Sequence, residues 1–343
     1  MSTLPLSAAV SPAPQSDAPA AANVRLLGLD AVRFLAIAGI VWRHAAETTS
    51  DAPGFFGVPF FLIVSLLLLG RSVGGRSDEP VLPLLRRRAA RLYVPFLFWC
   101  VVYEGLRQAK ALRHGEFNTD ALTPYALLGG TARHLWFLPF LLLCMCVAIP
   151  LLTWAARSIR RGTIIGVVAV VAAAVVIALP VPTKLTGTLP PDQEFSLSFY
   201  QAVPAALLGL GLATVLGLSK VVTRWGYAVG VIGLIGVVLT TAGQWRLAEP
   251  TLLLSTLGGI AAWLVAGSPL SGVATLAWLG RLSFGIYLSH VVFLRVIAQV
   301  AAAKHVGPSP ALDAAAFAVA LGGSAILTLA LRRSKYTRWT IGD

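Results

Sequence analysis

Three basic side chains fall inside one apolar segment of this sequence, residues 29–46. They are Arg33, Arg43 and His44. Charged groups inside a membrane helix are costly, and those that occur commonly serve binding or catalysis. Arg33 and His44 are eleven residues apart, so on a helix they share one face and lie roughly 16 Å apart along the axis. This stripe suits a tunnel with a cation at one end and an imidazole at the other, whereas the structural alternative is a snorkelling arginine and an interfacial histidine.

A second polar stripe runs along residues 276–298. Gly280, Ser283, Tyr287 and His290 recur there at spacings of three and four, so they share one helix face. For Ser283 and Tyr287 we favour interhelical hydrogen bonding. His290 is expected at the same depth as His44, and for it both this interpretation and a place in the site are open.

Two further candidates belong to the segments between these stripes. His134 and Trp136 begin the apolar segment 134–154, where an interfacial aromatic belt explains Trp136 and where His134 is a candidate at the mouth of the same cavity. Glu104 lies near the outer end of segment 89–106. A carboxylate beside an imidazole would fix its tautomer and raise its basicity, although Glu104 could equally be a solvated residue of the interface.

A basic cluster precedes the same segment. Arg88 and Arg91 are three residues apart, so they share a face at the start of a helix. Guanidinium groups bind phosphate through two parallel hydrogen bonds. The alternative is control of topology together with binding of anionic lipid headgroups, so the cluster alone is modest evidence for a nucleotide-like ligand.

The composition indicates that these groups belong to an integral membrane protein. Of 343 residues, 57% are hydrophobic and 12% are charged, whereas soluble domains carry about 25% charged residues. The net charge of +13 comes from residues in short loops between apolar segments and is not spread over a soluble face. That pattern is typical of membrane topology signals and argues against nucleic-acid binding.

The three cysteines do not indicate a metal site or a disulfide. Cys100, Cys144 and Cys146 all fall inside apolar segments, where buried thiols are expected. Cys144 and Cys146 have no second pair of ligands at metal-binding spacing. We therefore expect no bound metal.

Ten apolar segments are predicted to form an all-α bundle of transmembrane helices around a central tunnel. The second and third are short or interrupted by proline and charge, which suits helices that line a protein interior. The segments are residues 29–46, 57–70, 89–106, 134–154, 163–179, 199–217, 225–243, 251–267, 276–298 and 311–331.

The distribution of basic residues predicts the orientation. With the N-terminus placed inside and all ten segments spanning, sixteen Lys and Arg fall on the inner side and seven on the outer side. The positive-inside rule therefore favours both termini in the cytoplasm. Residues 1–24, rich in Ala, Ser and Pro, are predicted to be a disordered cytoplasmic tail, and residues 25–343 form the transmembrane domain.

These motifs, in this order, resemble the membrane acyltransferase 3 family. The resemblance covers most of the chain: the arginine, ten residues and histidine of Arg33–His44, the segment Phe60–Ser65, the pair Arg88 and Arg91, the pair His134 and Trp136, and the segment Gly280–His290. Two departures accompany it. Leu66 replaces the glycine that usually follows Ser65, and no extracytoplasmic hydrolase-like domain is expected after the membrane domain.

The resemblance implies a role for each matching residue. Arg88 and Arg91 would hold the phosphates of an acyl-CoA at the cytoplasmic face, and Arg33 would place this donor in the tunnel. His44 would be catalytic, as a general base or as a transient acyl carrier. Glu104 is its expected carboxylate partner from its place in the segment and not from the resemblance. The tunnel and the acceptor site would be lined by Ser65, His134, Trp136, Ser283, Tyr287 and His290.

The function that follows is O-acylation, with O-acetylation foremost, of a cell-envelope or exported carbohydrate at the bacterial cytoplasmic membrane. No resident cofactor is implied, because acyl-CoA, with acetyl-CoA foremost, is a co-substrate; membrane lipid and the acceptor are the other partners. One alternative is acylation of a small metabolite such as a macrolide sugar. A transporter is the other, although the inverted repeats with broken helices that are typical of transporters are not evident.

Overall fold

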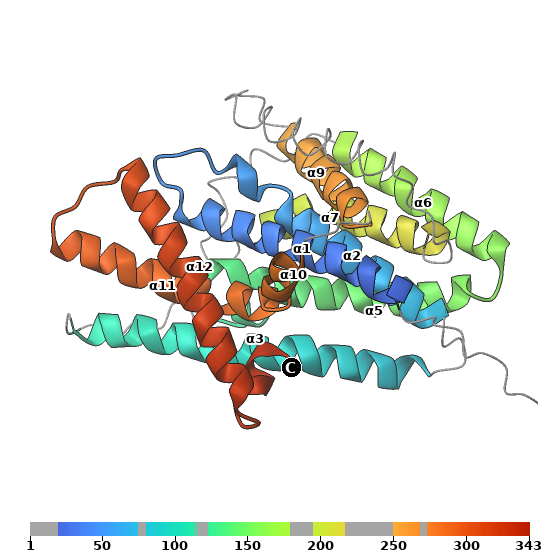
Figure 1. The fold of residues 1–343 in the computed structure, drawn as a ribbon. Helices are drawn as coiled ribbons and strands as arrows, with labels where there is room; N and C mark the ends of the chain where they lie inside the picture. Colours follow the sequence, from blue (N-terminus) through green and yellow to red (C-terminus); the bar gives the residue numbers. More distant parts are fainter. Residues whose placement is uncertain are drawn as a thin grey trace, which may run out of the picture.

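The computed structural model describes residues 20–74, 80–113, 115, 123–178, 195–216, 250–267 and 273–343. Within these residues the secondary structure is helical and includes no strand, which confirms the predicted all-α class (Figure 1). Residues 1–19 and the predicted seventh segment, 225–243, lie outside the described part of the chain.

Ten α-helices of at least seven residues make up the bundle in the described residues. They are α1 (Ala20–Ala45), α2 (Gly57–Gly74), α3 (Val81–Leu112), α5 (Phe137–Ala155), α6 (Ile159–Ala178), α7 (Phe195–Leu216), α9 (Pro250–Ala266), α10 (Ala274–Gly280), α11 (Ser283–Ala303) and α12 (Pro310–Arg333). Short helical turns connect them: η1 (Ala52–Gly54), α4 (Ala126–Gly129), η2 (Arg133–Trp136) and η5 (Arg338–Ile341).

Among the described residues, six helices are long and apolar enough to cross a membrane, namely α2, α3, α5 with the preceding η2, α6, α11 and α12. Shorter apolar stretches occupy α7 and α9. Most predicted segments coincide with one helix each, but segment 276–298 is interrupted. It divides into α10 and α11 at Arg281 and Leu282, next to the point where Gly280 meets α1. The total of ten spans and the orientation of the termini stay predictions.

Helix α1 lies at the centre of the bundle. It packs against α2, α9, α10, α11 and α12 (Figure 1). The apolar residues Ala36, Ile37 and Val41 on α1 are completely buried. Because neighbouring helices surround it, α1 can carry polar side chains that would be costly against lipid.

Two glycines allow close helix contacts beside the polar stripes, one between α10 and α1 and one between α11 and α12. A Cβ on Gly280 would overlap the carbonyl of Asp30 on α1, and a Cβ on Gly285 would overlap the side chain of Thr328 on α12. The departure at Leu66 is compensated elsewhere, because Leu66 is buried and Gly209 on α7 supplies the close contact with α2. Small residues let the backbones of packed helices come close in this way.

The contacts between helices define two ends of the bundle. At one end, the start of α1 meets Gly280, and Arg91 and Trp99 on α3 donate hydrogen bonds to the carbonyls of Gly342 and Thr340 at 3.0 and 2.9 Å. At the other end, the residues that follow α1 meet the start of α12 at Asp313. Helices α1 and α11 therefore run in the same direction, and α12 returns.

Replacement of Gly280 by alanine should destabilise the fold. The added methyl group would collide with the Asp30 backbone, and overpacking of this kind typically costs about 1–3 kcal/mol. Gly322→Ala on α12 is the matched control, because a Cβ there meets open space and should stabilise the helix by roughly 0.5–1 kcal/mol. Thermal unfolding of both variants in detergent, followed by tryptophan fluorescence, measures the difference. Equal melting temperatures would contradict the close contact.

Candidate active site

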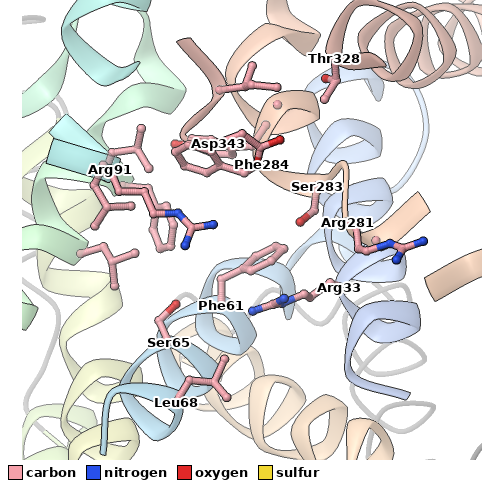
Figure 2. Close-up of a pocket in the computed structure, with 18 of the residues that line it drawn as sticks. Arg33, Phe61, Ser65, Leu68, Arg91, Arg281, Ser283, Phe284, Thr328 and Asp343 are labelled. Carbon is pink, nitrogen blue, oxygen red and sulfur yellow. The ribbon is translucent and has the colours of Figure 1, made fainter. Parts of the chain in front are cut away.

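A cavity of about 390 Å³ opens at the end of the bundle where α1 begins (Figure 2). Its size falls within the range of small-molecule sites. Five guanidinium and two carboxylate groups line it, so it carries an excess of three positive charges. They belong to Arg33, Arg88, Arg91, Arg281, Arg332, Asp30 and Asp343. We call this the arginine end.

The arginines of this cavity are held by short contacts. Arg33 Nη1 pairs with Asp30 Oδ1 at 3.0 Å, one turn earlier on α1. Arg91 Nε donates to the Gly342 carbonyl, and Arg332 pairs with Asp343. Figure 2 shows the guanidinium groups of Arg33 and Arg91 reaching into the hollow from opposite sides. Fixed positive charge in this arrangement suits a ligand with phosphate groups.

The remaining lining changes from polar to apolar along the cavity. The hydroxyl groups of Ser65 and Ser283 face the hollow (Figure 2). Side chains of Leu138, Leu141 and Met145 on α5 add an apolar part to the lining. A ligand with an anionic head and a slim, weakly polar arm matches this lining.

Three imidazole rings meet at the opposite end of the bundle, which we call the histidine end. The ring centroids of His44 and His290 are 5.3 Å apart, those of His134 and His290 are 4.9 Å apart, and those of His44 and His134 are 6.3 Å apart. His44 is exposed, whereas His134 and His290 are buried. The structure therefore brings together three histidines that are far apart in the sequence.

Two tyrosines hold the buried part of this cluster. The Tyr287 hydroxyl donates to the backbone carbonyl of His134, and the Tyr103 hydroxyl donates to that of Leu288 at 2.8 Å. The Tyr103 ring lies 5.1 Å from the His134 ring. These contacts join η2, α3 and α11, so the positions of His134 and His290 depend on one another.

Tyr287 separates the cavity from the histidine cluster. It lines the cavity together with Phe137, and the two rings are 5.7 Å apart. On its other side, its ring lies 5.6 Å from that of His134 and 6.2 Å from that of His290. The cavity and the histidines thus share this aromatic wall, and a continuous tunnel stays a prediction.

Glu104 and Trp136 contact other groups than the sequence analysis predicted for them. Glu104 pairs with Arg107 at 2.8 Å and accepts a hydrogen bond from Gln108, so its recorded contacts are with its own helix rather than with an imidazole. Trp136 packs against Phe140 and Phe199 in tilted arrangements, with ring centroids 5.9 Å away in both cases. Trp136 therefore belongs to an aromatic group beside the site.

A buried carboxylate that the sequence analysis missed secures the end of α1. Asp313 at the start of α12 is 2% exposed and accepts five hydrogen bonds from the backbone and hydroxyl groups of Glu47, Thr48 and Thr49. These residues begin three positions after His44, so Asp313 anchors the segment that leaves α1 next to that histidine. The signal was present, because Asp313 is an acidic residue within a predicted membrane segment.

Comparison with protein families yields one match. A family model described as an acyltransferase domain, that of the acyltransferase 3 family, covers residues 26–329, which is nearly the whole chain. No curated protein and no solved structure matches. The matched range includes the three histidines of the cluster, four of the five arginines of the cavity and Asp313. Arg332 lies just outside it.

Removal of the Asp313 carboxylate should release the segment after His44. Hydrogen bonds to a charged group are worth roughly 1.5–3 kcal/mol, so in Asp313→Ala the amides of Glu47, Thr48 and Thr49 should exchange hydrogen at least about ten times faster. Hydrogen-exchange mass spectrometry of the peptide that covers them measures the change. Ser309→Ala is the control, because it removes the N-cap of α12 and leaves the carboxylate in place. Equal acceleration in both variants would contradict the role of Asp313.

Proposed function

This chain belongs to the membrane acyltransferase 3 family, and we propose that it transfers an acyl group, with acetyl foremost, from acyl-CoA to a hydroxyl of an envelope or exported carbohydrate. One observation carries the proposal. Helix α1 places Arg33 in a cationic cavity and His44 in a cluster of imidazoles, and Tyr287 is the wall that both share.

The donor would bind at the arginine end. Arg88 and Arg91 lie one turn apart on α3 and line the cavity together with Arg33. Guanidinium forks match the oxygens of phosphate groups, and the hydroxyl and apolar lining beyond them suits a pantetheine arm. Acyl-CoA is a substrate in this proposal and not a resident cofactor. The thioester would then point toward Tyr287 and the histidine end.

The two ends of the bundle would face opposite sides of the membrane. The bias of Lys and Arg toward one side supports a cytoplasmic arginine end, where a soluble acyl-CoA has access. His44 is exposed at the other end, where an acceptor outside the membrane could reach it. The bacterial cytoplasmic membrane is the location that we propose for the protein.

The chemistry would need one proton acceptor and no net redox change. In the direct route, His44 removes the proton of the acceptor hydroxyl while the oxygen attacks the thioester carbonyl carbon. The carbon–sulfur bond breaks, and the coenzyme A thiolate takes up a proton. In the alternative route, His44 carries the acyl group transiently before the hydroxyl attacks. Both routes yield the same ester and free coenzyme A.

A small metabolite with a free hydroxyl, such as a macrolide sugar, is the alternative acceptor, and the same residues would serve it. A transporter without chemistry is the alternative of another class. The interruption between α10 and α11 is a feature that broken-helix transporters share. Formation of an acyl ester by the purified protein separates the two classes.

Loss of either phosphate-binding arginine should weaken donor binding. Arg88→Ala and Arg91→Ala should each raise the Kd for acetyl-CoA about ten-fold or more, because each removes hydrogen bonds between charged groups. Lysine should recover part of the loss, since it keeps the charge but not the planar fork. Calorimetric titration of acetyl-CoA into protein in nanodiscs measures both effects.

The matched control for this prediction is Arg87→Ala. Arg87 neighbours Arg88 but is not among the residues that line the cavity. Unchanged affinity in both alanine variants would show that the cluster serves topology and that the donor binds elsewhere. Full rescue by lysine, with altered insertion of the alanine variants, would lead to the same conclusion.

Removal of the exposed imidazole should abolish transfer and preserve donor binding. In His44→Ala, the rate of ester formation from radiolabelled acetyl-CoA and an oligosaccharide acceptor should fall by roughly 10²–10⁴, the usual contribution of a general base. The Kd for acetyl-CoA should not change, because His44 does not line the cavity. His305→Asn, at an exposed histidine in the loop after α11, is the control and should keep full activity. Near-normal transfer by His44→Ala would exclude that residue from the mechanism.

A further inference from the structure

The backbone around His290 determines which of its ring nitrogens carries a proton. Nδ1 lies 2.8 Å from the carbonyl oxygen of Tyr287 and 3.2 Å from that of Ile286. Carbonyl oxygens accept hydrogen bonds and cannot donate them, so Nδ1 must be the donor. In the neutral ring, Nε2 then keeps its lone pair.

That lone pair lacks a partner. Nε2 of His290 is buried and has no hydrogen bond within the described structure. A buried polar atom without a partner typically costs about 1–3 kcal/mol, so such an atom in a folded protein calls for an explanation. The two carbonyl groups of its own helix that lie next to the ring are acceptors, so they cannot donate a hydrogen bond to Nε2.

The neighbouring imidazoles are the candidate donors. His44 is the exposed one, and its ring centroid lies 5.3 Å from that of His290 at an interplanar angle of 38°. Glu104, the carboxylate expected to orient His44, is engaged by Arg107 and Gln108. Within the described residues, His44 has ring contacts with His290 and His134, whereas the hydrogen bonds of Glu104 go to its own helix.

We infer that His290 is the residue that positions His44, by accepting on Nε2 a hydrogen bond from a ring N–H of His44. The inference rests on the proposed acyl transfer. Catalytic hydrogen bonds are often long in the free enzyme and shorten in the complex, or are bridged by a water, and the present separation of the rings fits either case. The contact would fix the tautomer of His44 and leave its other nitrogen unprotonated.

This arrangement defines the path of the proton during transfer. The acceptor hydroxyl gives its proton to the free nitrogen of His44 as its oxygen forms a bond with the acyl carbon. The carbon–sulfur bond breaks, and the thiolate of coenzyme A receives the proton from His44. His290 neither gains nor loses a proton over the cycle, so it positions the base and stabilises the transient imidazolium.

Two substitutions at position 290 separate positioning from packing. His290→Leu removes the hydrogen-bond acceptor but still provides a bulky side chain for packing. We therefore expect kcat to fall at least about 100-fold with the KM for acetyl-CoA unchanged. His290→Gln supplies an amide oxygen that can accept the same hydrogen bond, and it should recover at least ten-fold of that loss. Ser289→Ala is the control, because its hydroxyl bonds to the Gly285 carbonyl of the same helix and its loss should leave kcat unchanged. Equal rates in the Leu and Gln variants would overturn the inference.

A spectroscopic measurement tests the pairing without relying on turnover. The chain has five histidines, so ¹⁵N NMR of the imidazoles can be assigned with single variants. We expect His290 to be the Nδ1–H tautomer and the His44 nitrogen shifts to change in His290→Leu but not in Ser289→Ala. Unaltered His44 shifts would overturn the inference even if the enzyme is active. Altered shifts in a protein that forms no ester would instead refute the proposed acyl transfer and keep the pairing.

His134 is the alternative candidate for the residue that positions His44. His134 lies 4.9 Å from His290 by ring centroids, and its Nε2 is likewise buried without a partner. If His134→Leu changed the His44 shifts and lowered kcat while His290→Leu did neither, the positioning residue would be His134.

Discussion

The cost of burying polar side chains among apolar helices determines where the functional groups of this protein lie. Several buried or half-buried charges of the described residues have a specific partner: Arg33 pairs with Asp30, Arg332 pairs with Asp343, and Asp313 accepts five hydrogen bonds from the segment after α1. A polar side chain can find such partners in the centre of a helix bundle, whereas at the lipid surface it would remain unpaired at a high cost in free energy. The central position of α1 follows, because that helix carries polar groups near both of its ends.

Close helix packing converts these separate charges into two sites. Gly280 brings α10 against the start of α1, and Gly285 brings α11 against α12. The polar faces of α1 and α11 are then adjacent along their length. As a result, Arg33 and Ser283 line one cavity, and His44 and His290 meet at the other end.

The separation of the two sites has a chemical consequence. A cationic, open cavity can bind an anionic donor reversibly, whereas the imidazole cluster combines one exposed ring, His44, with two buried rings, and backbone carbonyls fix the tautomer of His290. Tyr287 contacts both and is itself anchored to the backbone of His134. Movement of an acyl group between the sites would have to pass this ring and Phe137, so the aromatic wall is the place where donor and acceptor chemistry would meet.

The sequence by itself determined the class of the protein, most of the helices and the polar stripes that carry part of each site, but it did not indicate Asp30, Arg281, Arg332 or Asp343 of the cavity. Hydrophobic length identifies membrane helices, and the arginine and histidine stripe on residues 29–46 follows from helical periodicity, so these features are local. Contacts between distant segments are not local, and the sequence could not show that Glu104 turns to Arg107, that Gly280 interrupts the ninth segment, or that Asp313 holds the residues after His44. The tertiary structure alone decided which imidazole faces His44, because that depends on how α1, η2 and α11 pack.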